Sequence, residues 1–432
     1  MTAVDHRRWN TRGLGRFETA ERTTDPFAQI TALGIQAAVV LVGFDYTVMK
    51  GASVGLVIGL GLLPLWLPTM RRYTLAPTIL LLSVLCVPAG YVLSRLSSID
   101  HAVDSNLRTS WFGLILSGAA GMAIILWARA NFPLHRVVLL YGLGSLAQAV
   151  MFGSMSWKFD LSEPTTFVVL GLLERFRSRL LPAIAVLVLG VFGILDEGRS
   201  FFGFCLIAAT LTIWQMRPLG RLTKAARWFP VVLMVGICLA IYSLGTTLLT
   251  SGALGETLQE RSTAQIDATG SLLAGGRPEW AATRELIRQH PVGFGAGVVP
   301  SWADLQAGRT GLASINIDAG GYTTNYLFGE GFELHSVAAD LWVSFGLVGV
   351  ALAVVILVAL VRSMSFLIAE RRAATSVLFA CSLALWYLCF GPIYSNWLDI
   401  CVALGLALVV RDRARGEEDG PVPASVGTVP TA

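Results

Sequence analysis

The sequence predicts an all-α integral membrane protein with about twelve transmembrane helices and one large extracytoplasmic loop that contains short helices. Composition supports this class, because the 432-residue chain is 54% hydrophobic and only 14% charged, with a mean hydropathy of +0.66. A soluble domain carries roughly 25% charged residues. Apolar runs long enough to cross a bilayer fill the chain on both sides of a single long hydrophilic segment, 251–336. Helices are expected because lipid offers no partner to an open backbone.

The charges at the two ends of the chain set the expected topology. Residues 1–28 are polar, contain five arginines and lack a cleavable apolar stretch, so they predict a cytoplasmic tail rather than a signal peptide. Residues 411–432 open with a basic stretch and continue with Gly, Pro, Glu and Asp, which is typical of a disordered cytoplasmic tail. Because both basic ends favour the cytoplasm, an even number of crossings is required.

Eleven apolar runs are found between the tails, at 29–49, 51–69, 74–94, 110–128, 134–153, 180–195, 200–216, 229–250, 337–361, 375–391 and 393–410. A twelfth crossing is predicted at 166–176, after Pro164, as a short or tilted helix. Only this crossing brings Arg175, Arg177 and Arg179 to the cytoplasmic side with the other basic clusters. Nine helices are therefore expected within 29–250 and three within 337–410, with 251–336 facing outward.

The hydrophilic segment contains a predicted helix of its own. Pro278 suits the first helical position, Glu279 places an anion in the first turn, and His290-Pro291 ends the pattern. The glycine-rich run 293–297 allows a close approach of the backbone, but no strand precedes it. A dinucleotide-binding fold is therefore not predicted.

Three polar side chains stand at the ends of apolar or helical stretches, where a charge is usually retained for a partner: Arg199, Arg277 and His335. An arginine fork matches phosphate oxygens, and a neutral imidazole can accept a proton near pH 7. For Arg199 the alternatives are an ion pair with Asp196 or Glu197, or snorkelling of its side chain. Arg277 could instead lie on a solvated helix face, and His335 could have a purely structural role. Second-rank contacts to phosphate or sugar are predicted for Arg284, Arg288, Lys158, Trp280 and Arg309.

Several classes of site and partner are not expected. The six cysteines lie in apolar runs, which argues against a disulfide framework or a thiolate metal site. Neither an Asp-x-Asp nor a His-Glu-x-x-His pattern is present, so no metal and no cofactor are predicted. No solvated run combines basic and aromatic residues, which makes nucleic acid an unexpected partner.

The order of the polar motifs resembles the O-antigen ligase and O-antigen polymerase superfamily, which are bacterial polytopic membrane glycosyltransferases. The resemblance covers the twelve-helix layout and the pattern from about residue 190 onward. The motifs that carry it are Glu197-Gly198-Arg199-Ser200 at a helix start, Gly276-Arg277-Pro278-Glu279-Trp280 before a helix that ends at His290-Pro291, the glycine run after it, and His335-Ser336 at the start of an apolar run.

The resemblance implies a polyprenyl-diphosphate-linked glycan donor, a glycan or glycolipid acceptor, and an active site on the outer face of the bacterial cytoplasmic membrane. Arg199 and Arg277 would hold the diphosphate, His335 would act on the acceptor hydroxyl, and no metal ion would be needed. The chain departs from the family in having Ser336 where asparagine is frequent. It also enlarges the loop at 316–326, which suggests an acceptor-specific lid.

Other functions remain open at this stage. A polysaccharide polymerase of the same superfamily shares the donor chemistry with a ligase, and the ligase is our first choice. A twelve-helix secondary transporter would account for the intramembrane residues Asp45 and Asp399, although it has no need of a long hydrophilic segment with a structured arginine helix. A structural scaffold in an envelope complex would not require Arg277 or His335.

Overall fold

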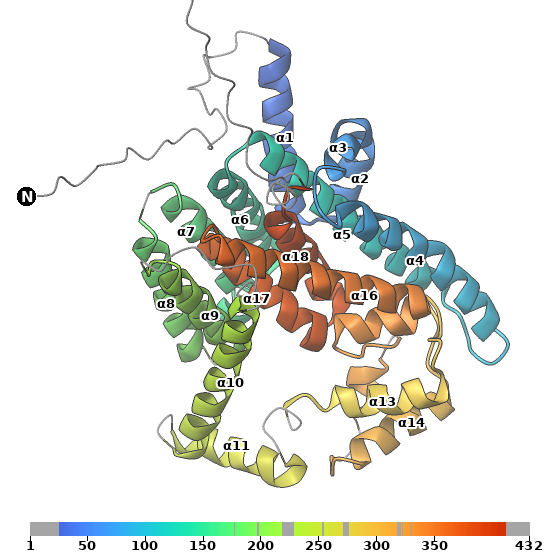
Figure 1. Ribbon diagram of the computed structural model, residues 1–432. Coiled ribbons are helices and arrows are strands. Elements are labelled where there is room, and N and C mark those ends of the chain that lie inside the picture. Colours follow the sequence, from blue (N-terminus) through green and yellow to red (C-terminus); the bar gives the residue numbers. More distant parts are fainter. Residues whose placement is uncertain are drawn as a thin grey trace, which may run out of the picture.

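The computed structural model describes residues 26–176, 178–196, 198–217, 229–252, 255–270, 276–317, 321, 323–329 and 331–411. Within these residues the structure is all-α apart from one two-stranded hairpin, which confirms the all-α part of the prediction (Figure 1). Most of the two predicted tails, 1–25 and 412–432, lies outside the described residues, as do Glu197 and part of the 316–326 loop.

The elements before the hydrophilic segment follow the predicted apolar runs closely, with one exception. They are α1 (Pro26–Phe44), β1 (Thr47–Met49), β2 (Ala52–Ser53), α2 (Val54–Gly61), α3 (Leu63–Met70), α4 (Ala76–Ser97), α5 (Ser105–Asn131), α6 (Leu134–Phe152), the π-helical turn η1 (Trp157–Leu161), α7 (Ser162–Leu173), α8 (Leu180–Leu195), α9 (Arg199–Trp214) and α10 (Phe229–Thr250). A helix therefore forms after Ser162, at the position of the predicted twelfth crossing.

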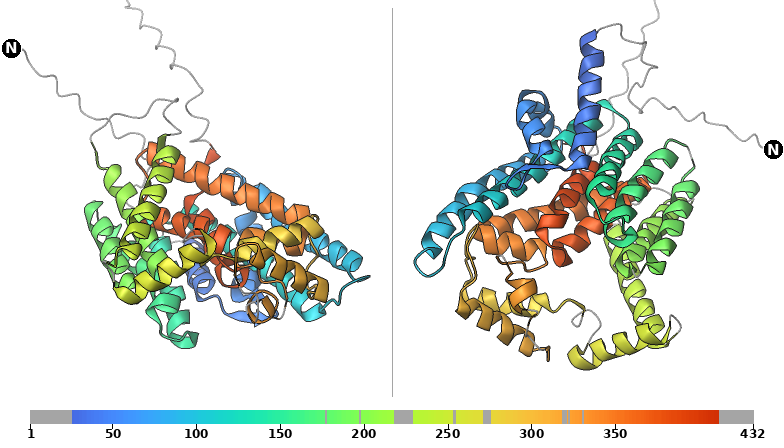
Figure 2. Two further views of the ribbon diagram at one scale, coloured as in Figure 1. Left: turned by 90° about the horizontal axis from the view of Figure 1, so that it is seen from below. Right: turned by 180° about the vertical axis from the view of Figure 1, so that it is seen from behind.

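The remaining elements belong to the hydrophilic segment and to the C-terminal part of the bundle. They are α11 (Glu256–Thr269), α13 (Glu279–Gln289), α14 (Trp302–Ala313), the π-helical turn η3 (Thr323–Leu327), α16 (Val337–Ala369), α17 (Thr375–Phe390) and α18 (Ile393–Ala407). Helices α13 and α14 lie together at one end of the bundle, while α10 leads away from it to α11 (Figures 1 and 2).

The exception is the run 51–69, which sequence analysis predicts as one crossing. It forms part of the β hairpin and two helices, α2 and α3, of 8 residues each. Pro64 is the second residue of α3. In a continuous helix its ring would clash with the preceding turn, and it has no backbone N–H to donate a hydrogen bond. At 1.5 Å per residue, neither helix alone spans about 30 Å of hydrocarbon.

Among the described residues, four helices are long and apolar enough to cross a membrane: α4, α5, α6 and α16, with 22, 27, 19 and 33 residues. Shorter apolar helices of 10 to 17 residues lie within α1, α8, α9, α17 and α18. This composition is compatible with a membrane protein. The number of twelve crossings and the outward side of 251–336 stay predictions.

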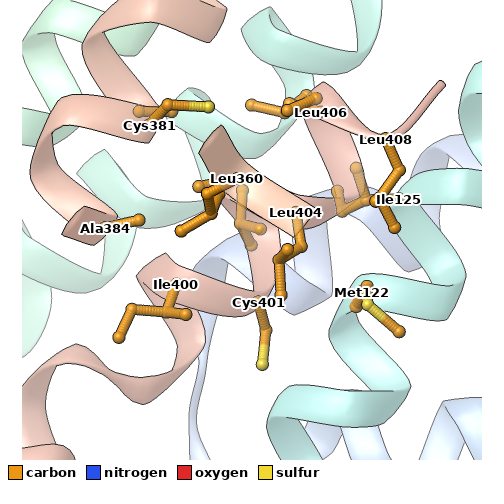
Figure 3. Packing of buried hydrophobic residues seen from close by; sticks show 14 of the residues in the cluster. Met122, Ile125, Leu360, Cys381, Ala384, Ile400, Cys401, Leu404, Leu406 and Leu408 are labelled. Carbon is orange, nitrogen blue, oxygen red and sulfur yellow. The ribbon is translucent and has the colours of Figure 1, made fainter. Parts of the chain in front are cut away.

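The core of the bundle forms where α5, α16, α17 and α18 meet. Helix α5 is buried along most of its length, and Met122 on it lies near Cys401 and Leu404 of α18 (Figure 3). Leu360 of α16 and Cys381 of α17 close the same cluster. The C-terminal end of α17, on which the candidate site depends, is thus carried by the best-packed part of the molecule.

A kink in α16 joins the hydrophilic segment to this bundle. Gly346 adopts φ 58° and ψ −139° inside the helix, and a Cβ atom there would lie 2.5 Å from the Val292 carbonyl oxygen. The kink frees the Val343 carbonyl, which accepts hydrogen bonds from the backbone N–H groups of Phe294 (2.8 Å) and Gly295 (2.9 Å). The glycine-rich run therefore packs its backbone against α16, the close approach that its composition predicts.

A second, smaller core lies within the hydrophilic segment. Leu286 of α13, Leu312 of α14 and Phe294 of the glycine-rich run are buried together with Leu327 and Leu334, and the cluster continues onto Trp342 of α16. The buried residues of this cluster accordingly form a packed unit that rests on the first turns of α16.

Candidate active site

His335 lies at the junction between the hydrophilic segment and α16. Its φ is 51°, an unusual backbone conformation for a residue with a side chain. The next residue, Ser336, caps α16: its hydroxyl accepts from the Ala339 N–H (3.4 Å) and donates to the Leu388 carbonyl (3.1 Å). Serine and asparagine are both preferred at this capping position, so the departure at Ser336 preserves its structural task.

Buried Asp340 fixes the backbone on either side of this junction. One carboxylate oxygen accepts from the Leu334 N–H (2.9 Å) and the other from the Ile393 N–H (3.0 Å) at the start of α18. The residue before His335 is thereby tied to two helices. The strained backbone at His335 is held by bonds to its neighbours on both sides.

The imidazole of His335 makes two contacts. Its Nδ1 is 2.8 Å from the Glu333 carbonyl oxygen, and because a carbonyl can only accept, Nδ1 carries the proton in the neutral ring and Nε2 has the lone pair. The ring of Tyr326 stacks on it, with 4.0 Å between centroids and 16° between planes. His335 can thus act as a base through Nε2.

Arg277 lies at the C-terminal end of α17. Its guanidinium is over the ring of Trp386, 5.4 Å from the centroid, and 6.0 Å from that of Phe390. Both contacts are cation–π interactions, and the negative end of the α17 dipole adds to the attraction for a cation. Aromatic support of this kind orients the plane of the guanidinium.

Trp280 anchors the start of α13 at the same place. Its indole N–H donates to the Cys389 carbonyl, 2.8 Å away. The last carbonyls of a helix have no partner within the helix, so Trp280 and Ser336 satisfy two neighbouring ones, at Cys389 and Leu388. Segment 277–280 and the His335 junction therefore meet at the end of α17. Trp280, which the sequence predicts to contact substrate, has a structural role there.

Arg199 is at the first position of α9 and is exposed. Helix α9 runs antiparallel to α17, because the Thr212 hydroxyl is 3.1 Å from that of Thr375 at one end, and the Phe204 and Trp386 rings are 5.8 Å apart towards the other. The start of α9 is therefore at the same end of the bundle as the end of α17. All three predicted catalytic residues share this end.

The predicted alternative for Arg199, an ion pair, is not formed with Asp196. The Asp196 carboxylate accepts from the backbone N–H of Lys158 (2.9 Å), and no described residue forms an ion pair with Arg199, whereas Glu197 lies outside the described part of the chain. Lys158 itself lies over the Phe159 ring, 5.1 Å from the centroid. It belongs to the region around the start of α9.

The other second-rank arginines have local partners. Arg284 donates to the Ser314 hydroxyl (3.2 Å) at the end of α14, and Arg288, with 73% of its side chain exposed, is 3.6 Å from Glu285. Arg309 lies over the Trp302 ring at 5.3 Å. Arg284 and Arg288 stand one and two turns further along α13 than Trp280.

Sequence reasoning missed the role of Tyr326 and of the acids around it. Burial raises the pKa of the Tyr326 phenol, Glu279 and Glu333 raise it further, and Arg277 opposes them. These interactions place Arg277, Glu279 and Tyr326 in one electrostatic environment with His335. The sequence carries no signal for this, because no local pattern relates Tyr326 to His335.

A cluster of two histidines around the buried Asp304 was also missed. His101 Nε2, in the loop between α4 and α5, is 2.9 Å from Asp304 Oδ2, and His290 Nε2 is 3.9 Å from Oδ1 of the same carboxylate. Asp304 also accepts from the Ser301 N–H and hydroxyl in the capping box of α14. The cluster joins α14 to the α4–α5 loop and ties the end of α13 to them.

An apolar groove opens beside the start of α9. It has a volume of about 550 Å³ and is lined by side chains of η1, α7 and α8: Trp157, Thr165, Leu189, Phe192, Leu195 and Asp196. Asp196 is three residues before Arg199 in the chain. A hydrophobic chain lying in this groove would place a polar head close to the start of α9.

In comparisons with known proteins, the chain matches no family model, no curated protein and no solved structure. Its function is therefore argued from the site.

Proposed function

We propose that this protein is a membrane glycosyltransferase of the O-antigen ligase type. It would transfer a glycan from a polyprenyl-diphosphate-linked donor to an acceptor hydroxyl on the outer face of the bacterial cytoplasmic membrane, without a metal ion or other cofactor. The observation that supports the proposal most is the convergence of Arg277 and the His335–Ser336 junction at the end of α17, where Arg277 lies over Trp386 and Phe390 and the Ser336 hydroxyl donates to the Leu388 carbonyl.

In this proposal His335 is the general base. Nε2 takes the proton of the acceptor hydroxyl while the hydroxyl oxygen forms a bond to the anomeric carbon of the donor. The bond from that carbon to the diphosphate oxygen breaks, and the electron pair leaves with the polyprenyl diphosphate. The Glu333 carbonyl keeps Nδ1 protonated, which reserves Nε2 for this transfer.

Arg277 and Arg199 would stabilise the negative charge that develops on the leaving diphosphate. Trp386 and Phe390 hold the guanidinium of Arg277 by cation–π contacts, and its N–H groups would bind phosphate oxygens in pairs. Arg199 is exposed at the first position of α9, where its guanidinium is accessible to an anion. Two preorganised arginines supply charge that a divalent cation would otherwise provide.

The donor lipid has a candidate place beside these arginines. The groove of Trp157, Leu189, Phe192 and Leu195 is apolar and lies next to the start of α9. A prenyl chain in it would gain roughly 25 cal/mol for each Å² of apolar surface removed from water. The diphosphate would then meet Arg199 first and Arg277 next.

Two other functions serve as alternatives, and an observation in the helical bundle favours one of them. A polymerase of the same superfamily would use the same donor site and extend a lipid-linked chain repeatedly. A secondary transporter gains support from polar pairs within the helical bundle, in which Tyr141 donates to Asp399 (3.1 Å) and Tyr387 to Glu163. Ionisable groups among apolar helices often mark a proton or substrate pathway.

The test is a transfer assay with the purified protein in proteoliposomes. A polyprenyl-diphosphate glycan and a panel of glycolipid acceptors are supplied with and without a chelator, and the products are sized. One addition per acceptor supports a ligase, and a ladder supports a polymerase. Substrate accumulation without a glycan product would support the transporter, and loss of transfer with chelator would contradict the metal-free mechanism.

A further inference from the structure

The contact between Tyr326 and His335 is part of a closed arrangement of the chain. Tyr326 lies on η3, and the next residue, Leu327, is fully buried and accepts a hydrogen bond from the Glu333 N–H (2.9 Å). The Glu333 carbonyl in turn accepts from His335 Nδ1 (2.8 Å). The two ends of segment 326–335 therefore meet at the imidazole, where the Tyr326 ring stacks at 4.0 Å.

The two contacts of His335 constrain different motions of its ring. The bond from Nδ1 to Glu333 sets which edge of the imidazole faces the backbone and fixes the tautomer. The stack with Tyr326, with only 16° between the planes, sets the tilt of the ring. Together they leave the Nε2 edge as the part of the ring that can meet a substrate.

We propose that Tyr326 is a positioning residue for His335, and that it holds the imidazole plane so that Nε2 faces the acceptor hydroxyl. This inference rests on the proposed function. The phenol ring also attracts the positive charge that forms on the imidazole as it takes the proton, since an aromatic face favours a cation. Such an interaction strengthens in the transition state, and its loss lowers kcat more than it raises KM.

The position of Tyr326 makes the geometry of the base depend on one contact. The His335 ring is held in this orientation only while the Tyr326 ring is stacked on it. The donor site at Arg277 and Arg199 does not depend on the stack.

Two substitutions separate the ring from its hydroxyl group. Tyr326→Phe keeps the stack, and Tyr326→Leu removes it while keeping an apolar side chain. We expect Phe to retain kcat within about threefold, and Leu to lower kcat on the order of 10- to 100-fold with the donor KM within about twofold. Tyr242→Leu is the matched control, because Tyr242 is an exposed tyrosine of α10 (43% exposure) outside the predicted site, and we expect it to keep full activity.

A second measurement does not require transfer activity. Diethyl pyrocarbonate modifies accessible imidazoles, and mass spectrometry of the His335 peptide gives the rate at this residue. We expect Tyr326→Leu to raise the rate several-fold over wild type and Tyr326→Phe to leave it unchanged, since the stack covers one face of the ring. If the wild type transfers no glycan, the proposed function fails while this measurement still tests the stack.

Two results would overturn the inference. Wild-type kcat together with a wild-type labelling rate in Tyr326→Leu would show that the stack does not position His335. Equal loss of kcat in Tyr326→Phe and Tyr326→Leu would assign the effect to the hydroxyl rather than to the ring. If Tyr326→Leu does not fold, as judged by its elution as an aggregate, Tyr326→Met replaces it in the same comparison.

Discussion

The indole N–H of Trp280 donates a 2.8 Å hydrogen bond to the carbonyl of Cys389, and this bond seats the start of α13 on the end of α17. Arg277 lies three residues earlier, over the rings of Trp386 and Phe390. The position of the predicted phosphate-binding arginine therefore depends on a tryptophan that sequence analysis assigned to substrate contact.

Trp280→Phe is expected to weaken the attachment of α13 to the end of α17, because it removes the indole N–H and keeps an aromatic ring. Loss of one net hydrogen bond, about 1 kcal/mol, corresponds to a fall of roughly fivefold in donor affinity if Arg277 is displaced with the helix. Donor binding by isothermal calorimetry checks this. Trp302→Phe serves as the control. An unchanged donor affinity in Trp280→Phe would show that the hydrogen bond from Trp280 to Cys389 does not position Arg277.

Arg277→Lys is expected to lower donor affinity about 10-fold or more, because a point-like ammonium cannot form the paired bonds of a guanidinium. Arg199→Lys should behave in the same direction. Arg71→Lys is the control, since Arg71 is exposed at the end of α3 and is not among the predicted substrate contacts. Equal affinities for the three variants would argue against an arginine clamp.

The capping chemistry of α13 could be read from the sequence, whereas its surroundings could not. Pro278, Glu279 and His290-Pro291 act locally, and α13 spans Glu279–Gln289 as they indicate, with Pro278 as the capping residue rather than the first helical one. Most apolar runs also became helices, because their length and composition are local properties. These signals sufficed for the class and for the placement of Arg277 and His335 at element ends.

Long-range contacts supplied part of what sequence analysis missed. The division of 51–69 into a strand and two short helices is instead a local effect, because it follows from Pro64 and the hairpin before it. The pairing of Tyr326 with His335, and of His101 with Asp304, joins residues that no local pattern relates. Such contacts depend on how the hydrophilic segment packs, which a single sequence does not reveal.

Gly346→Ala is expected to destabilise the protein by about 1–3 kcal/mol, because the residue has a positive φ that alanine adopts only with strain. The new Cβ would also approach the Val292 carbonyl to 2.5 Å. Thermal unfolding in detergent measures the effect. Gly203→Ala in α9 is the control, since no atom lies within 4 Å of its added Cβ, and a similar midpoint in both variants would contradict the role of the kink.

Tyr326 is expected to titrate above the usual value near 10, since burial and the Glu279 carboxylate raise its pKa. Because the pKa of Tyr326 is raised in the folded protein, its neutral phenol stabilises the fold. This stabilisation is fully present below about pH 10. That stability is lost as the pH rises through the folded-state pKa. The absorbance difference between wild type and Tyr326→Phe reports this titration. Glu279→Gln should move it to lower pH, and a shift to higher pH would contradict the proximity of the two groups.

The most direct test of the central claim compares His335→Gln with wild type in glycan transfer and in donor binding. Glutamine keeps the size and polarity of the side chain but cannot act as a base at neutral pH. The expected result is a fall in kcat on the order of 100- to 10,000-fold with donor affinity unchanged. Transfer by His335→Gln at the wild-type rate would contradict the assignment of His335 as the base.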